Sequence, residues 1–377
     1  MATPGENAAL ARLAKGFEHF ADSDCEDPLY IAICRHVARS EALLQLMLAA
    51  PPEQRRPNLL LAAVHHRLLE ERAAGAQHAL AAYFPSVGGS RAPDAALSAC
   101  FDDFVDGERG ALLDRITRRA TQTNETGRCA VVRPALRELA ALSGRQRLAL
   151  LDFGCSAGLN LGVDQWPIDY GDFMLGAAVQ GGVPPLHCRL VGGGRPSPAL
   201  AEPVIVSRLG IDLAPVDVQD DDAVRWLQAC IWPHDRERME RLEHAIAVAR
   251  RERWPVRRET DGVVAIARWL DTLPGDVQPV VMNSWVLAYF EPPDLASHVE
   301  GMLQLVRERG LAWLSGEGPQ LRIAGAAAPP PPDGEAEILS NTLWTLAWRD
   351  AAGELRSEVL ARSHPHGRWL QWIGLVR

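Results

Sequence analysis

The sequence predicts an α/β protein in which an all-helical N-terminal domain precedes a mostly parallel β-sheet. Residues 1–145 show helical periodicity and no convincing strand. The apolar run Leu148–Leu151 then leads into Asp152 and a glycine-rich turn, as a buried parallel strand does. From about residue 200 onward, strand-like and helix-like segments alternate, which is typical of a parallel sheet covered by helices. We therefore expect two domains, 1–145 and 146–377.

Composition limits the classes of protein to consider. The chain has 377 residues, of which 47% are hydrophobic and 23% are charged, as in ordinary globular proteins. Its net charge is −9 and its arginines are spread among acids, so we expect no nucleic-acid partner. No apolar run approaches the roughly 18 residues of a membrane span. The N-terminus also lacks the basic start and apolar core of a signal peptide, so we expect no membrane association.

The numbers of cysteines and lysines further limit the classes of protein to consider. Seven cysteines without a Cys-x-x-Cys pair suggest reduced thiols and a cytoplasmic protein. Lys15 is the only lysine, and it lies in the N-terminal tail. This excludes a P-loop, whose lysine contacts phosphates, and a pyridoxal enzyme, which needs a Schiff-base lysine.

The first helices are predicted from apolar stripes and capping residues. Ser40 is placed to cap the helix that follows it, and residues 58–71 form a further helix. His65 and His66 are adjacent in that helix, so they point to different sides and cannot chelate one metal together. We therefore expect packing or surface roles for both histidines and predict no metal site.

The segment Leu148–Leu161 contains the spacing Asp-x-Gly-x-x-x-Gly, with Asp152, Gly154 and Gly158 at the fixed positions. Gly154 allows a sharp turn, and Gly158 allows close approach of a ligand or of the strand. A helix starting here would offer free N–H groups to an oxygen-rich ligand. The segment resembles the first motif of class I S-adenosylmethionine-dependent methyltransferases. This resemblance implies a Rossmann-like sheet and S-adenosylmethionine as the cofactor.

Three later strands each end near a polar residue that could face the cofactor. In methyltransferases an acid at the end of the second strand holds the two ribose hydroxyls, and Asp212 fits that pattern. Asp261 ends the third strand, where it could reach the adenine amino group, and Asn283 ends the fourth. The strands are expected at residues 203–215, 256–261, 278–286 and 311–315, with a helix at 294–309. The predicted cofactor-binding residues are Asp152, Gly154, Ser156, Gly158, Asn160, Asp212, Asp261 and Asn283.

The spacing of these strands requires additional segments. Gly158 and Asp212 are 54 positions apart, whereas a simple strand–helix–strand unit needs about 30 residues, so we expect an insertion near 165–203. Residues 325–334 are predicted to form a loop. The runs 343–349 and 366–373 are predicted to form a final antiparallel pair of strands.

Polar residues outside the strands are the predicted substrate contacts. Asn124, Glu125 and Arg128 form a dense polar run before the glycine-rich turn, and we expect them to face the ligand cleft. Glu125 is the predicted general base, and His366 is the second predicted catalytic residue. The predicted substrate-binding residues are Asn124, Arg128, Tyr170 and Arg368.

Two other interpretations of the glycine-rich turn remain open. The same residues read Gly-x-Ser-x-Gly, the nucleophile elbow of α/β-hydrolases, with Ser156 as the nucleophile. The acid would be Asp271 or Asp294, and the base His364 or His366. The predicted helical domain offers neither the earlier strands nor the oxyanion loop that hydrolases need. The other interpretation is a glycine-rich turn that only packs against its neighbours. A further possibility for the whole protein is that it binds a nucleoside ligand without turnover.

Over nearly its full length the chain resembles a family of uncharacterised bacterial proteins, a domain of unknown function. The shared segments are PNLLLAAVHH, YFPSVGG, TQTNETGRC, the glycine stretch, GIDLAPVDV, LAYFEPP and HPHGRWLQW. The family implies no activity, but its core resembles the class I methyltransferase fold. The leading expectation is methyl transfer from S-adenosylmethionine to a small-molecule acceptor, a reaction in which positioning supplies most of the catalysis.

Overall fold

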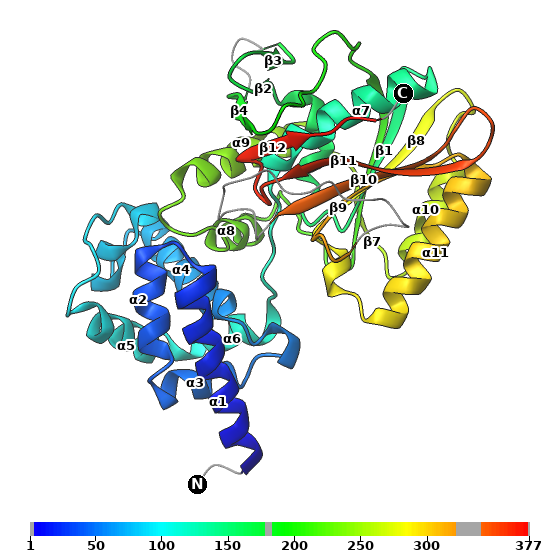
Figure 1. Ribbon diagram of the computed structural model, residues 1–377. Helices are drawn as coiled ribbons and strands as arrows, with labels where there is room; N and C mark the ends of the chain where they lie inside the picture. Colours follow the sequence, from blue (N-terminus) through cyan, green and yellow to red (C-terminus); the bar gives the residue numbers. More distant parts are fainter. Residues whose placement is uncertain (1–3, 178–182, 322–340, 376–377) are drawn as a thin grey trace. The chain divides into compact units, whose positions relative to one another are not determined.

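The computed structural model describes residues 4–177, 183–321 and 341–375 (Figure 1). The chain forms two compact units, each built from two segments. Unit 1 comprises Met1–Thr123 and Gln219–Glu240, and unit 2 comprises Asn124–Val218 and Arg241–Arg377. The expected boundary at residue 145 falls after helix α7, which belongs to unit 2. The loop predicted at 325–334 lies outside the described residues.

Unit 1 is helical throughout its described part, and its helix starts are set by capping side chains. Asp27 accepts the N–H groups of Leu29 and Tyr30 at 2.9 and 3.2 Å, which satisfies donors that have no partner inside the helix. Ser40 caps the next helix as predicted, by accepting the N–H of Leu43. The helices are α1 (Pro4–His19), α2 (Pro28–Val37), α3 (Glu41–Met47), α4 (Pro57–Ala73), α5 (Leu97–Gly107), α6 (Arg109–Arg118) and α8 (Asp221–Ala229), with short turns η1 (Phe20–Asp24), η2 (Pro52–Gln54), η3 (Ala79–Tyr83) and η4 (Pro85–Val87).

One apolar core holds unit 1 together. It contains side chains of helices α1 to α6, among them the fully buried Phe17 and Leu60. Trp226 of α8 is also part of this core, although it lies about a hundred residues further along the chain. Because burying a large apolar side chain stabilises the fold by about 1.5–3 kcal/mol, Trp226 fixes the returning segment to the first six helices.

Unit 2 contains a nine-stranded sheet in the order β5-β12-β11-β10-β9-β8-β1-β6-β7. Strands β7, β6, β1, β8 and β9 are all parallel, and β10 and β11 follow in antiparallel pairing. The strands are β1 (Arg147–Phe153), β5 (Arg189–Leu190), β6 (Val204–Asp212), β7 (Val256–Arg258), β8 (Gln278–Ser284), β9 (Ala312–Glu317), β10 (Thr342–Arg349), β11 (Leu355–Ser363) and β12 (Trp369–Trp372). The predicted α/β class with a mostly parallel sheet is therefore confirmed.

The first strand, β1, lies in the middle of the parallel part of the sheet. In the sheet, β6 and then β7 follow β1 on one side, and β8 and then β9 follow it on the other. The order of the strands therefore reverses at β1. In open parallel sheets, ligands bind outside the carboxyl ends of the strands at such a reversal. This edge carries the ends of β1, β6, β8 and β9.

Helices α10 (Gly262–Leu270) and α11 (Pro292–Arg309) pack against one face of the sheet (Figure 1). Their apolar side chains share a core with Leu151 of β1 and Trp313 of β9. Gly310 ends α11 with φ +66°, the left-handed conformation that glycine adopts without strain. The remaining helices of unit 2 are α7 (Cys129–Ser143) and most of α9 (Arg236–Glu252), with short turns η5 (Thr126–Arg128), η6 (Leu159–Gln165) and η7 (Leu287–Tyr289).

The predicted pairing of the last two strand-like runs is wrong. Strand β11 lies between β10 and β12 and pairs antiparallel with both of them. The first half of β11 is partly exposed and includes Arg356 and Glu358, so its sequence lacks the apolar run that marks a buried strand. Its buried half, Val359–Ser363, is too short to be distinguished from a turn by periodicity alone.

The described part of the segment 165–203, where we expected an insertion, is anchored to α7 by two buried arginines. Arg137 donates to the carbonyl oxygens of Ser197 and Pro198, both at 3.1 Å, and Arg133 forms an ion pair with Glu202. Each arginine thereby satisfies backbone groups of a loop that forms little regular structure of its own. The insertion contains a small sheet of β2 (Ile168–Asp169), β3 (Met174–Leu175) and β4 (Leu186–His187).

Among the described residues, no helix combines the length and apolar character needed to cross a bilayer. All seven cysteines lie in the described ranges, and none of them forms a disulfide.

Candidate functional site

The turn after β1 carries the Asp-x-Gly-x-x-x-Gly pattern to the carboxyl edge of the sheet. Gly154, Ser156 and Gly158 have φ angles of +72°, +53° and +69°, so the chain folds back sharply within five residues. A positive φ is unfavourable for Ser156, as for any residue other than glycine. The N–H groups of Gly154 and Cys155 both donate to the carbonyl oxygen of Ile211, which attaches the turn to the end of β6.

The two glycines of this turn are required by packing. A Cβ atom on Gly154 would lie 2.4 Å from Cγ2 of Val286, and one on Gly158 would lie 2.7 Å from Cγ2 of Val256. Both distances are shorter than carbon atoms tolerate, and both residues also have positive φ. The turn therefore packs closely against the segment that follows β8 and against the first residue of β7.

The segment after Gly158 differs from the predicted α-helix. It is the short 3₁₀ turn η6, which is kinked at Gly162. The amide of Asn124 bridges the glycine-rich turn from Cys155 to Leu159: its nitrogen donates to the Cys155 carbonyl at 3.0 Å, and its oxygen accepts the Leu159 N–H at 2.9 Å. Asn124 thus lies against the glycine-rich turn, and its side chain fixes the shape of that turn.

Asp212 meets the glycine-rich turn from the neighbouring strand. It is the last residue of β6, and its Oδ2 accepts the N–H of Ser156 at 2.8 Å. Its Oδ1 accepts the N–H of Ala214 at 2.8 Å. The side chain is partly exposed, and each carboxylate oxygen has a second lone pair. The predicted acid and the predicted turn are therefore in direct contact.

The other members of the polar run, Glu125 and Arg128, are buried next to the turn at His364–Gly367. Arg128 donates to the Ser284 hydroxyl at 3.0 Å and to the Pro365 carbonyl at 3.1 Å. Gly127 packs so closely on the carbonyl of His366 that a Cβ atom would lie 2.2 Å from it. The structure thus brings the run that contains Glu125 and Arg128 together with the segment that contains His366.

Glu125, the predicted general base, is 4% exposed and has cationic and backbone partners. Its Oε1 accepts the N–H of Gly127 at 2.8 Å and lies 3.3 Å from Nη2 of Arg241. An arginine beside a carboxylate favours its charged form, which is the form that accepts a proton.

Asp152 is 3% exposed, and its Oδ2 has no hydrogen-bond partner among the described residues. Burial raises the pKa of Asp152 to about 8, an effect that the nearby Arg128 opposes. At neutral pH the side chain is therefore mostly a neutral carboxyl group, which can donate as well as accept a hydrogen bond. Asn160, also buried, accepts a weak hydrogen bond from the thiol of Cys129.

Asn283 at the end of β8 lies in a buried network with β9. Its oxygen accepts the indole N–H of Trp313 at 2.7 Å, and its nitrogen donates to Oε1 of Glu317 at 2.7 Å. Oε1 of Glu317 also accepts the N–H groups of Val286 and Leu287, while its Oε2 is buried without a hydrogen-bond partner in the described chain. Burial raises the pKa of Glu317.

Sequence analysis did not identify Glu317 as a site residue. The available signal was its position in the segment Ser315-Gly316-Glu317-Gly318, which places an acid at the carboxyl end of the fifth parallel strand.

The remaining predicted residues lie in separate surroundings. Asp261 caps α10 by accepting the N–H of Val264 at 3.1 Å. Tyr170 is buried in the insertion, where its hydroxyl donates to the Ala130 carbonyl and burial raises its pKa. Arg368 is exposed.

The residues of the hydrolase interpretation divide between the two edges of the sheet. Asp271 follows α10, which runs back from the end of β7 toward the start of β8, so Asp271 lies on the edge opposite Ser156. Asp294 is in the first turn of α11, just after β8, and is on the same edge as Ser156. His364 Nδ1 accepts the N–H of His366 at 2.9 Å.

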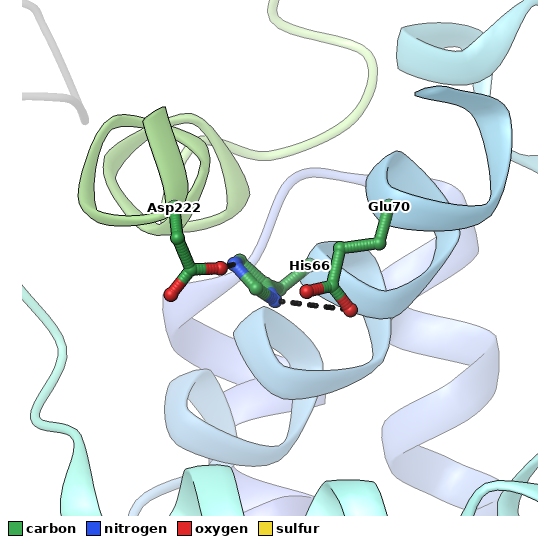
Figure 2. Close-up of side chains that lie close together, drawn as sticks. All are labelled: His66, Glu70 and Asp222. Carbon is green, nitrogen blue, oxygen red and sulfur yellow. Dashed lines mark ion pairs between the residues drawn. The ribbon is translucent and has the colours of Figure 1, made fainter. Parts of the chain in front are cut away.

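A second polar cluster lies in unit 1, where Figure 2 shows His66 between Glu70 and Asp222. One ligand atom from each of the three residues lies within 4.8 Å of the others, which is close enough for a metal ion. His66 Nε2 is 3.2 Å from Oδ1 of Asp222, and Nδ1 is 3.9 Å from Oε2 of Glu70. His66 and Glu70 are one helical turn apart on α4, and Asp222 comes from α8.

Arginines already occupy the groups that a metal ion would need. Arg115 donates from Nε to His66 Nδ1 at 2.9 Å and from Nη2 to Glu70 at 2.6 Å. Arg119 pairs with Asp222. A cation would have to displace these guanidinium groups and would be repelled by them. This cluster is therefore an ion-pair network that joins α4, α6 and α8.

Comparison with known proteins gives one family for the chain. The family described as "Uncharacterized protein conserved in bacteria (DUF2332)" matches residues 14–372. No curated protein matches the chain. The match extends over both units and includes the glycine-rich turn, Asp212 and the His364–Arg368 segment. The chain thus belongs to DUF2332, a family of uncharacterized proteins conserved in bacteria.

Proposed function

We propose that unit 2 has a Rossmann-like, methyltransferase-like sheet, binds S-adenosylmethionine and transfers its methyl group to a small-molecule acceptor. The observation that carries this proposal is the hydrogen bond from the Ser156 N–H to Asp212. It joins the glycine-rich turn of β1 to the acid that ends β6, at the edge where the strand order reverses. A turn and an acid in this relation are suited to a ligand with a sugar, because backbone groups and a carboxylate meet in one place.

The residues around the turn fit a nucleoside ligand in their chemistry. Asp212 is partly exposed and keeps one lone pair on each oxygen after accepting the two N–H groups of Ser156 and Ala214. It can therefore accept hydrogen bonds from two vicinal hydroxyl groups. Asn124 holds the turn rigid, so little ordering is needed when a ligand binds.

The cofactor supplies a methyl group on an activated sulfonium, so the protein's tasks are positioning and proton removal. Glu125 is the group we assign to proton removal, because it is the buried carboxylate of the polar run that contacts the His366 segment, and Arg241 holds it in place. Arg128 fixes the segment at residues 364–367 against the polar run and so holds His366 beside it. The acceptor's polar groups would then meet Asn124, Arg128 and Arg368.

Isothermal titration calorimetry with S-adenosylmethionine and with S-adenosylhomocysteine tests this function. We expect the wild-type protein to bind both ligands. Asp212→Ala should weaken binding by about 10- to 100-fold, because each charge-assisted hydrogen bond is worth roughly 1.5–3 kcal/mol. A wild-type protein that gives no heat and no thermal shift at millimolar ligand would contradict the cofactor assignment.

Two variants separate lost binding from lost folding. Asp276→Asn is the matched control, since Asp276 pairs with Arg147 at the start of β1, on the opposite edge of the sheet. It should bind like the wild type. Gly158→Val is less informative, because its side chain would strike Val256 and destabilise the turn directly. Unchanged binding in Asp212→Ala would show that another acid holds the ribose.

A further inference from the structure

His65, the neighbour of His66, is completely buried in unit 1 and forms a pair with a serine. Its Nε2 lies 2.6 Å from the hydroxyl oxygen of Ser86, which belongs to the short turn η4. Its Nδ1 lies 3.1 Å from the carbonyl oxygen of Ala229, the last residue of α8. The two adjacent histidines thus face different partners, as their positions on one helix require.

The carbonyl of Ala229 fixes which nitrogen of His65 carries the proton. A carbonyl oxygen only accepts hydrogen bonds, so the proton of the neutral ring is on Nδ1. Nε2 then has a free lone pair and accepts the hydroxyl proton of Ser86. The ring of Phe84 lies 5.6 Å from the His65 ring, centre to centre, and restricts its rotation. Burial lowers the pKa of His65 to about 4, so the ring is neutral at physiological pH.

Ser86 is held in place and is partly exposed, whereas His65 is not. The N–H of Val87 donates to the Phe84 carbonyl at 3.1 Å, which closes the turn around the serine. Arg72 donates from Nη1 to the carbonyl oxygen of Ser86 at 2.6 Å. Its guanidinium group therefore puts a positive charge on the backbone of the turn that carries the serine.

We propose that Ser86 is a nucleophile, with His65 as its general base, and that it accepts the acyl group of a carboxylic ester. A serine bonded to a base that is itself oriented by a third group is the arrangement that activates a hydroxyl. Arg72 favours the negative charge that develops on the ester carbonyl oxygen under attack. This activity belongs to unit 1 alone and does not depend on the function proposed for unit 2.

The reaction has two balanced steps. In the first, the Ser86 Oγ bonds to the ester carbonyl carbon while its proton moves to His65 Nε2. The carbon–oxygen bond to the alcohol then breaks, the alcohol leaves with that proton, and acyl-Ser86 remains. In the second step, water attacks the acyl group and gives a proton to His65. The acid is released, and the proton returns to the Ser86 oxygen.

Labelling with a fluorophosphonate tests the nucleophile directly in the full-length protein. The reagent bonds to an activated serine and loses fluoride, and intact mass with peptide mapping locates the adduct. We expect one adduct, on Ser86. Ser86→Ala should abolish labelling, and His65→Gln should slow it by about 100-fold or more, as loss of a general base does. Arg72→Gln, at an exposed position, should slow it by about 10-fold.

A nearby serine serves as the matched control. Ser90→Ala changes an exposed serine four positions from Ser86. This variant should label at the wild-type rate. Mapping the wild-type protein requires no variant to fold, so it decides the question by itself. An unlabelled wild-type protein, or an adduct on Ser156 in place of Ser86, would overturn the proposal.

Discussion

The acids of the two units have different surroundings. In unit 1, Glu70 and Asp222 are ion-paired with arginines that come from neighbouring helices. In unit 2, Asp152 and Glu317 each keep one buried carboxyl oxygen that has no hydrogen-bond partner among the described residues. The first arrangement joins helices, whereas the second raises the pKa of both acids at the carboxyl edge of the sheet. Acids that are costly to bury in this way are typical of functional sites.

Removing an arginine from the unit 1 network should have the largest effect on stability at a fixed neutral pH among the ion-pair and capping variants. Arg115→Ala leaves Nδ1 of His66 and a carboxylate oxygen of Glu70 without this donor. We expect the free energy of unfolding to fall by about 2 kcal/mol, because the buried Nδ1 of His66 loses its hydrogen-bond donor while Glu70 keeps its ion pair with Arg67. Urea denaturation followed by circular dichroism measures this.

Arg118→Ala is the matched control for that variant. Arg118 lies on the same helix and pairs with Asp114, but its side chain is 78% exposed. Its loss should cost less than about 1 kcal/mol. Equal losses in the two variants would show that the network contributes no more than a surface ion pair.

Asp152→Asn tests the arrangement in unit 2, where a buried acid keeps an oxygen without a hydrogen-bond partner among the described residues, through the pH dependence of stability. The pKa of Asp152 is raised from near 4 to about 8 in the folded protein, so folding favours the protonated form. Its contribution to stability is complete below pH 4 and is lost as the pH rises toward 8. The wild type should therefore lose stability relative to Asp152→Asn between pH 5 and pH 8, by at most about 1.4 kcal/mol per pH unit. A difference that stays constant over this range would mean that Asp152 is ionised.

The smallest effect is expected at an acid of unit 2 that is not buried. Asp261→Ala removes the cap of α10 and should lower the free energy of unfolding by about 1 kcal/mol. Asp261→Asn keeps an oxygen that accepts the Val264 N–H and should be close to the wild type. A loss above about 3 kcal/mol for Asp261→Ala would show that this carboxylate has a role in the fold beyond capping.

The central parallel strands β1 and β8 were predictable from the sequence because their buried runs are nearly all apolar. Strand β1 and strand β8 are bounded by polar residues and glycines, and the structure places both within two residues of their predicted limits. Strand β11 was missed because half of it is exposed and its polar residues mask the alternation. The path of the insertion depends on Arg133 and Arg137 of α7. The local sequence pattern does not predict contacts between residues so far apart in the chain.

The part of the candidate site that lies around the ends of the strands could be predicted from the sequence. Asp212 and Asn124 were singled out from their positions, and both contact the glycine-rich turn. Pairs that depend on tertiary folding were not predictable. Ser86 and His65 are 21 positions apart, and no spacing rule brings a turn residue to a helix histidine. The carbonyl that orients His65 comes from Ala229, which is more distant still.

Because unit 1 is built from two segments, its assembly is tied to the order of synthesis. A ribosome that adds about 5–20 residues per second needs roughly 5–20 s to make the stretch between Thr123 and Gln219. During that interval the six N-terminal helices are outside or leaving the ribosome without Asp222, Trp226 and Ala229. The nascent helices must hold an exposed core surface until α8 arrives, after β1 and β6 of unit 2 have been made. Nascent chains that are stalled before residue 219 should therefore bind chaperones. Chains that are stalled after residue 240 should release these chaperones.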